Sequence, residues 1–241
     1  MTPDLRRFTM ARVGLRRTGN SVSTRDLLDF QLAHARARDA VHGPFDPHAI
    51  KVHGLETVIV KSAARDREEY LRRPDRGRIL DKNSIDTDRI EGPFDVVFIV
   101  ADGLSPLAVQ TQAAQLLEII VPKISGWTIA PLIVAAQARV ALSDEIGAIT
   151  KSALAVMLIG ERPGLSSFDS MGVYLTWNPK PGLTDANRNC ISNIRPEGLS
   201  VEAASNLLLL LMREARGKQL SGVNLKTGLR PSLLGNDSTE P

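Results

Sequence analysis

Two short apolar runs constrain this chain more than any other feature of its sequence. They are Phe94–Val100 (FDVVFIV) and Ala155–Ile159 (AVMLI), and each is followed or preceded by a segment of helical periodicity. Strands that are apolar on both faces and alternate with helices are typical of a parallel sheet covered on both sides. We therefore predict an open, mostly parallel, Rossmann-like α/β sheet flanked by helices.

The apolar periodicity also predicts the individual elements of this fold. Strands are expected at about 94–100, 129–137, 155–159, 172–177 and 190–195. Helices are expected at about 107–121, 139–152 and 201–216. We expect Ser105 to accept a hydrogen bond from the first free N–H groups of the helix that follows it, and Pro106 to occupy the first helical position, where no N–H is needed.

The N-terminal part of the chain has a different character. A helix is predicted from Arg25 to His42, because Leu28, Leu32 and Ala35 recur at helical spacing and Gly43 ends the pattern. We expect its apolar stripe to pack and its polar side to meet water or a partner. We divide the chain into a helical and charged docking arm (1–91), an α/β domain (92–228) and a loosely held tail (229–241).

Composition excludes several classes of protein. The 30 Lys and Arg against 27 Asp and Glu give a net charge of +3, which is too mild to predict a nucleic-acid partner. The longest apolar runs, Ala153–Ile159 and Leu207–Met212, are far shorter than the roughly 20 residues that cross a bilayer. The single cysteine, Cys190, cannot form an internal disulfide, and the first residues lack the apolar segment of a secretion signal. We therefore expect the protein to be located in a reducing cytoplasm.

The common enzyme signatures are missing from the sequence. There is no G-x-G-x-x-G, Walker loop, G-x-S-x-G, C-x-x-C or H-E-x-x-H motif, and all four histidines precede the predicted sheet. We expect no metal site. Ligands of open α/β sheets bind beyond the carboxyl ends of the strands, so the segments that follow the strands are the candidates. They are 101–105 (ADGLS), 160–166 (GERPGLS) and 189–194 (NCISNI).

Each candidate segment has a plain structural explanation as well. The glycine and first helical amides of ADGLS could hold an anion, or form an ordinary capped turn. Glu161 could accept hydrogen bonds from a ligand, or form a surface arrangement with Arg162. Cys190 favours a small buried side chain over a catalytic thiol, because no histidine lies near it in the sequence.

Together these segments resemble the small subunit (light chain) of ethanolamine ammonia-lyase, an adenosylcobalamin-dependent enzyme. The resemblance lies in four stretches and covers most of the chain. They are ARVGLRRTGNSVSTRDLLDFQLAHARARDAVH (11–42), VADGLS (100–105), LIGERPGLSS (158–167) and RNCISNIRPEGL (188–199).

The resemblance implies a radical lyase that converts ethanolamine to acetaldehyde and ammonia. In this family a TIM-barrel large subunit holds ethanolamine and the catalytic side chains, and the small subunit forms part of the wall around the corrinoid. An assembly of six large and six small subunits is implied, with no nucleic acid and no membrane. The family is often housed in bacterial microcompartments, so the implied location is a microcompartment or the cytoplasm.

The resemblance also assigns the site residues. Glu161 in GERPGL, Cys190 in RNCISNI and Val140 in ARVALSDEIG match the family's cobalamin-contact positions, and none is expected to touch substrate. Glu161 is expected to accept bonds from corrin amides or nucleotide hydroxyls, while the other two pack against the corrin or offer backbone groups. Phe168 stands where the family pattern has proline, which puts the shape of that loop in doubt.

The sequence is also compatible with another class of protein. The chain could be a stand-alone α/β nucleotide-binding or regulatory domain that uses the ADGLS turn. The lack of a phosphate-binding fingerprint counts against this alternative.

Overall fold

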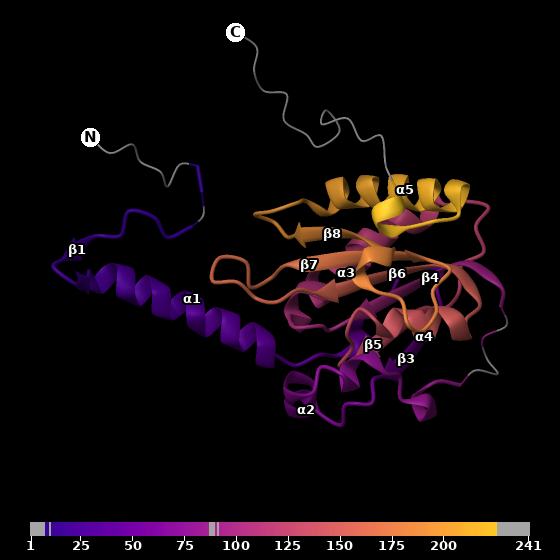
Figure 1. Ribbon diagram of the computed structural model, residues 1–241, viewed down its shortest axis with the longest axis horizontal. Coiled ribbons are helices and arrows are strands. Elements are labelled where there is room, and N and C mark those ends of the chain that lie inside the picture. The colour runs from indigo at the N-terminus through magenta and orange to yellow at the C-terminus, as the bar shows by residue number, and fades with distance from the viewer. Residues whose placement is uncertain (1–7, 10, 87–89, 91, 226–241) are drawn as a thin grey trace, which may run out of the picture.

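The computed structural model describes residues 8–9, 11–86, 90 and 92–225 of the chain. These residues form a six-stranded sheet in the order β3-β5-β4-β6-β7-β8, with helices on both faces (Figure 1). Strands β3, β5, β4 and β6 run parallel, and β7 is antiparallel to both of its neighbours. The predicted open, mostly parallel α/β fold is confirmed, and the tail 229–241 lies outside the described residues.

The sheet is built from strands of five to nine residues. The strands are β3 (Thr57–Lys61), β4 (Phe94–Ala101), β5 (Leu132–Ala136), β6 (Ser152–Gly160), β7 (Met171–Trp177) and β8 (Arg188–Ile194). The helices are α1 (Thr24–His42), α2 (Arg67–Arg72), α3 (Pro106–Ile120), α4 (Leu142–Ile149) and α5 (Val201–Lys218). A small hairpin of β1 (Arg17–Thr18) and β2 (Ser21–Val22) precedes α1.

Most predicted elements lie within a few residues of the observed ones, but the region around α4 needs correction. The predicted helix 139–152 is shorter, because Leu142–Ile149 alone is helical and Ser152 already begins β6. The predicted strand 129–137 is shorter too, since Ile129 forms only an isolated bridge with Val96.

Each face of the sheet has its own hydrophobic cluster. Alternate residues of a strand point to opposite faces, so Val96, Phe98 and Val100 pack on α3 and α5, while Val97 and Ile99 pack on α4. In Figure 1, α5 and α4 lie on opposite sides of the sheet. This double coverage explains why β4 and β6 are apolar at nearly every position.

Strand β3 was not predicted from the sequence. It pairs in parallel with β5 at the edge of the sheet, within the stretch assigned to the N-terminal arm. The charged segment that follows it is also attached to the sheet, because Tyr70 and Leu80 are buried. The part of the arm that projects from the body is therefore α1 with its small hairpin (Figure 1).

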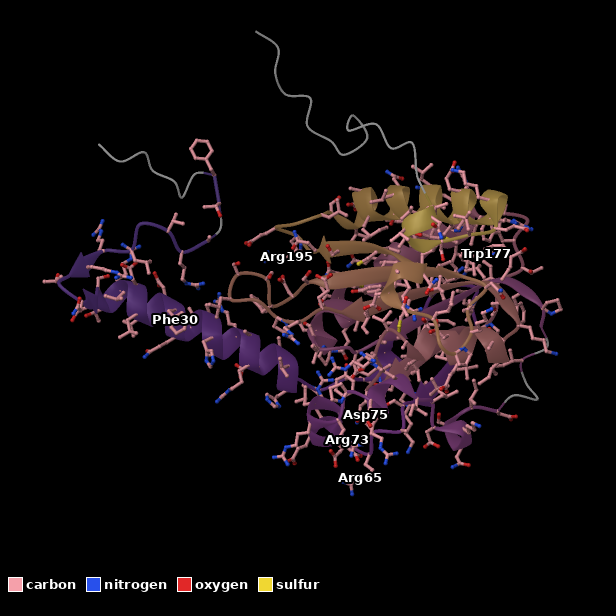
Figure 2. All side chains as sticks on the ribbon, viewed as in Figure 1. Phe30, Arg65, Arg73, Asp75, Trp177 and Arg195 are labelled. Atoms are coloured by element: carbon pink, nitrogen blue, oxygen red, sulfur yellow. The ribbon has the colours of Figure 1, made fainter. Side chains whose placement is uncertain are left out.

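Helix α1 forms where it was predicted, and Ser23 caps it by accepting a bond from the Asp26 N–H. Its apolar stripe, however, does not pack on this chain. The buried residues of α1 are Ala33 and Ala40, seven positions apart and therefore on one side of the helix. The large apolar side chains Leu27, Leu28, Phe30 and Leu32 are 42–57% exposed, and Figure 2 shows Phe30 on the projecting helix.

Candidate functional site

Glu161 is the first residue after β6. Its carboxylate oxygen Oε2 accepts hydrogen bonds from the hydroxyl of Ser170, at 2.5 Å, and from the backbone N–H of Asn193, at 3.2 Å. Among the described residues these are the carboxylate's two hydrogen bonds, so the other oxygen, Oε1, keeps its capacity to accept. Arg162 is exposed, and no ion pair between it and Glu161 is present in the described part of the chain. The surface pairing considered for these two residues is not what forms.

Cys190 lies on β8 directly opposite Tyr174 on β7. Directly opposed residues of an antiparallel pair point to the same face, so the two side chains are neighbours. Cys190 is a free, exposed thiol, so the expectation of a small buried side chain is wrong. Partial desolvation is the main cause of the raised pKa of the Cys190 thiol, and the negative charge of Glu161 adds to it, while Tyr174 acts in the opposite direction.

Strand register places these groups on one face of the sheet. Ile159 is opposite Gly172 and Met157 is opposite Tyr174, so continuing the alternation puts Glu161 on the same face as Tyr174 and Cys190. Desolvation is the main cause of a raised pKa at Tyr174, and the nearby charge of Glu161 contributes. Glu161, Tyr174 and Cys190 therefore share one face of the sheet.

Val140 approaches the same face from the turn that precedes α4. It is half-buried and packs, like Tyr174, against the cluster between α4 and the sheet. Its carbonyl oxygen accepts bonds from the N–H and the hydroxyl of Ser143, at 3.1 and 2.8 Å, which close the first turn of the helix. The structure thus brings Val140, Glu161 and Cys190, from three separate segments, to one side of the sheet.

Helix α4 covers only part of this side. Its Asp144 forms a buried two-pronged ion pair with Arg188 at the start of β8, with N–O distances of 2.6 and 2.7 Å. Cys190 and Asn193, farther along the same strand, are exposed. The result is a partly open sheet face that carries one carboxylate, one thiol and one phenol; we call Val140, Glu161, Tyr174 and Cys190 the open face.

The loop between β6 and β7 is braced from three directions. The Ser105 hydroxyl donates to the carbonyl of Phe168 at 2.9 Å, and the Gln112 amide donates to the carbonyl of Asp169 at 2.9 Å. Arg195, labelled near the end of β8 in Figure 2, pairs with the Asp169 carboxylate at 2.8 Å. The Phe168 ring faces the guanidinium of Arg36 on α1, at 6.0 Å. Both the carbonyl oxygen and the ring of Phe168 therefore make contacts that hold the loop.

The ADGLS turn after β4 is packed against its own chain. Gly103 has a φ of +54°, and a Cβ at this position would lie 2.2 Å from the carbonyl oxygen of Gly160. The N–H of Leu104 donates to that same oxygen at 2.9 Å. The glycine therefore serves a close backbone approach between two strand ends. Ser105 makes no side-chain cap, contrary to expectation, because its hydroxyl is used by Phe168.

A polar cluster that sequence analysis missed lies behind this turn. Arg67 donates to the Asp102 carboxylate at 2.9 Å, to the carbonyl of Gly103 at 2.8 Å and to the carbonyl of Val41 at 2.8 Å. Asp102 is 2% exposed, and it also accepts a bond from the Ala138 N–H at 3.1 Å. Arg67 therefore ties the last turn of α1 to the end of β4.

Other residues around the candidate site were also missed. Ser170, Asn193 and Tyr174 contact the predicted site residues, yet nothing in their local sequence marks them. RNCISNI was singled out as a segment, but only the strand register shows that the Asn193 N–H reaches Glu161. Within the described ranges, no three His, Cys, Asp or Glu side chains gather as metal ligands would. None of the described helices has the length and apolar content needed to cross a bilayer.

Comparison with known proteins gives a consistent result. A family model described as ethanolamine ammonia-lyase light chain (EutC) matches residues 1–226. A protein of Pseudomonas aeruginosa (strain LESB58) is 52% identical over 233 residues, which are 92% of this chain and 85% of that one. A protein of Pseudomonas fluorescens (strain Pf0-1) is 53% identical, covering 98% and 90% of the two chains. A protein of Ralstonia nicotianae is 51% identical, covering 95% and 89%. All three are named ethanolamine ammonia-lyase small subunit.

Proposed function

The chain belongs to the ethanolamine ammonia-lyase light chain family, and from this we propose that it is the cofactor-binding small subunit of an adenosylcobalamin-dependent ethanolamine ammonia-lyase. It acts in a complex with a large subunit, which holds ethanolamine and the catalytic side chains. The complex converts ethanolamine to acetaldehyde and ammonia. The match over residues 1–226 supports this assignment to an enzyme class.

The observation that carries the cofactor assignment is the state of the Glu161 carboxylate. Oε2 is occupied by Ser170 and Asn193, while Oε1 remains able to accept a bond on a partly open sheet face. A corrinoid presents amide N–H groups and hydroxyls at its periphery, and these are the donors that a carboxylate oxygen binds well. Val140 and Tyr174 add apolar surface to the same face. Glu161, Val140 and Tyr174 therefore fit a bound corrinoid.

The chain's own contribution is to hold and shield the cofactor. When bound, adenosylcobalamin supplies the radical that starts the reaction. Glu161 binds the periphery of the corrinoid, and Val140 and Cys190 pack beside it. The raised pKa values of Cys190 and Tyr174 keep both groups protonated at neutral pH, so neither is a ready base or nucleophile. This supports a non-catalytic role for the chain.

We propose that α1 is the part of the N-terminal arm that docks on the large subunit. Its apolar side chains Leu27, Leu28, Phe30 and Leu32 are exposed, and Arg67 holds its last turn on the body. An exposed apolar stripe on a projecting helix is a common form of interaction surface. A small subunit needs a large-subunit partner, and this stripe offers it the apolar contact area.

The proposed function is tested by reconstitution. The chain is expressed alone and together with its large subunit, adenosylcobalamin and ethanolamine are added, and acetaldehyde is measured. We expect acetaldehyde only when both subunits are present. Acetaldehyde formation by this chain alone would contradict the proposal.

The cofactor assignment is tested by Glu161→Ala in the assembled complex. Loss of one charged hydrogen-bond acceptor should weaken cobalamin binding about tenfold or more, with little change in the KM for ethanolamine. Glu197→Ala is the matched control, because Glu197 is a carboxylate on the neighbouring β8–α5 loop that pairs with Arg195. An unchanged cobalamin Kd in the correctly assembled Glu161 variant would refute the assignment.

A further inference from the structure

We infer that Ser170 is a positioning residue, which together with the backbone of Asn193 fixes the Glu161 carboxylate so that Oε1 faces the cofactor. This inference rests on the proposed function, because it assigns a role at the same site. Beyond the proposed contact of Glu161 with the corrinoid, Ser170 and Asn193 make this carboxylate an effective acceptor.

Ser170 is built into the structure at the position directly across from Glu161. The N–H of Glu161 donates to the carbonyl of Ser170 at 2.9 Å, which extends the β6–β7 pairing by one residue pair. Directly opposed residues of an antiparallel pair point to the same face, so the two side chains meet. Ser170 is only 3% exposed, and its hydroxyl is 2.5 Å from Oε2. A buried hydroxyl bound to an ionised carboxylate forms a strong contact.

Asn193 supplies the second bond from an unusual backbone conformation. Its φ is +59°, in the left-handed region that non-glycine residues rarely adopt. The pairing of β7 with β8 shifts register between Met171 and Val173, beside this residue. The conformation directs the Asn193 N–H to Oε2, while the Asn193 carbonyl accepts a bond from Leu199 at 2.8 Å. Two donors thus converge on one carboxylate oxygen.

Gly172 keeps space beside the other oxygen. A Cβ at this position would lie 2.9 Å from Oε1, and its three nearest atoms would all belong to the Glu161 carboxyl group and side chain. Any larger residue would displace the carboxylate. Ser170 and Asn193 therefore hold Oε2, while the missing side chain of Gly172 gives Oε1 the space that it occupies.

A carboxylate held in this way binds its ligand better than a free one. An unrestrained glutamate loses rotamer freedom when it binds, which lowers affinity. Two bonds to Oε2 remove that freedom in advance and leave Oε1, beside Gly172, as the oxygen that can accept a further bond. Substitution of Ser170 should therefore change cofactor affinity only through its effect on Glu161.

The test is a set of cobalamin titrations on the assembled two-subunit complex, with cyanocobalamin as an inert probe and Kd as the readout. Ser170→Ala should raise Kd about threefold to tenfold, and Ser170→Thr, which keeps the hydroxyl, should restore most of the affinity. In a Glu161→Ala background, Ser170→Ala should have no further effect. Ser167→Ala in the same loop is the control, because the backbone of Ser167 pairs with Gly164.

Gly172→Ala provides an independent route, because the three atoms nearest to its added methyl group all belong to Glu161. It should raise Kd in the wild-type background and leave Kd unchanged in the Glu161→Ala background. If Ser170→Ala prevents assembly, this second cycle decides the question.

Two results would overturn the inference in distinguishable ways. Weak binding in Glu161→Ala with normal binding in both Ser170→Ala and Gly172→Ala would refute positioning and leave the proposed function intact. Normal binding in all three variants would remove the cofactor assignment itself.

Discussion

Among single residues, Asp102 is the carboxylate whose burial has the clearest measurable consequence. Desolvation raises its pKa to about 6, although Arg67 and the backbone N–H of Ala138 oppose this shift. In an unfolded chain the pKa is about 3.9. At a pH between these two pKa values, Asp102 is protonated to a greater extent in the folded state than in the unfolded state. The free energy of unfolding should therefore fall as pH rises from 4 to 6, by up to about 3 kcal/mol from this group.

Asp102→Asn should remove this contribution. We expect urea unfolding at pH 4 to 7 to show a shallower decline between pH 4 and 6 in the variant than in the wild type. Asp75→Asn is the control, because Asp75 is exposed at the edge of the molecule and Arg73 lowers its pKa (Figure 2). The same pH dependence in wild type and Asp102→Asn would show that the buried carboxylate does not titrate in this window.

Gly103 supports a second prediction for a single residue. An alanine there would place its Cβ 2.2 Å from the carbonyl oxygen of Gly160 and would retain a φ of +54°. Steric conflict and backbone strain together should lower the free energy of unfolding by about 2 to 4 kcal/mol.

Gly126→Ala separates the two causes. Gly126 also has a positive φ, of +84°, but no atom lies within 4 Å of its added Cβ. Gly126→Ala should lower the free energy of unfolding only through backbone strain, by about 1 kcal/mol. Equal losses of stability in the two alanine variants would show that the contact with Gly160 contributes nothing.

Among the elements, α1 is the one whose exposed face predicts a function. Leu28 and Leu32 are one turn apart and are 57% and 52% exposed. The double variant Leu28→Gln/Leu32→Gln keeps helix propensity and should change the free energy of unfolding of the isolated chain by less than about 0.5 kcal/mol. It should weaken binding to the large subunit about tenfold or more, because two leucines lose their burial in the complex.

The measurement is the Kd between the subunits, with urea unfolding of the isolated chain alongside. Val223→Gln is the control, since Val223 is 72% exposed and belongs to a short turn near the start of β8 rather than to α1. Normal assembly by the α1 double variant would exclude the apolar stripe as a docking surface.

At the scale of the whole molecule, burial is distributed unevenly. The central strands β4 and β6 are buried along most of their length, whereas α1 buries only two of its 19 residues among those described. Helices with few buried contacts open locally at low free energy. Amide hydrogen exchange in the isolated chain should therefore be much faster in α1 than in β4 and β6.

Assembly should change this pattern in two separable steps. Adding the large subunit should slow exchange in α1, and adding cobalamin should slow exchange further in β8 around Cys190 and Asn193. Strand β4 serves as the internal reference, because it is buried in all states. No slowing in α1 on assembly would contradict the docking role of this helix.

Several elements could be predicted because their signals lie in consecutive residues. Strands β4 and β6 are apolar on both faces, and α5 was expected at 201–216 and is found at Val201–Lys218. The N-terminal helix was also placed correctly. The edge strand β3 was missed, because five residues in a polar surrounding carry little periodic signal until they are paired with β5.

Local chemistry and resemblance to a family were enough, from the sequence alone, to predict the α/β class, most helices and strands, and the three candidate contacts at Val140, Glu161 and Cys190. Only the tertiary structure showed that α1 turns its alanines inward and its leucines outward, that the Ser105 hydroxyl serves Phe168, and that Ser170 and Asn193 hold Glu161. The periodicity of apolar residues predicts a helix or a strand, but the face that becomes buried depends on which distant segment packs beside it. Strand register and close contacts between backbone segments determine that packing, and neither can be predicted from neighbouring residues.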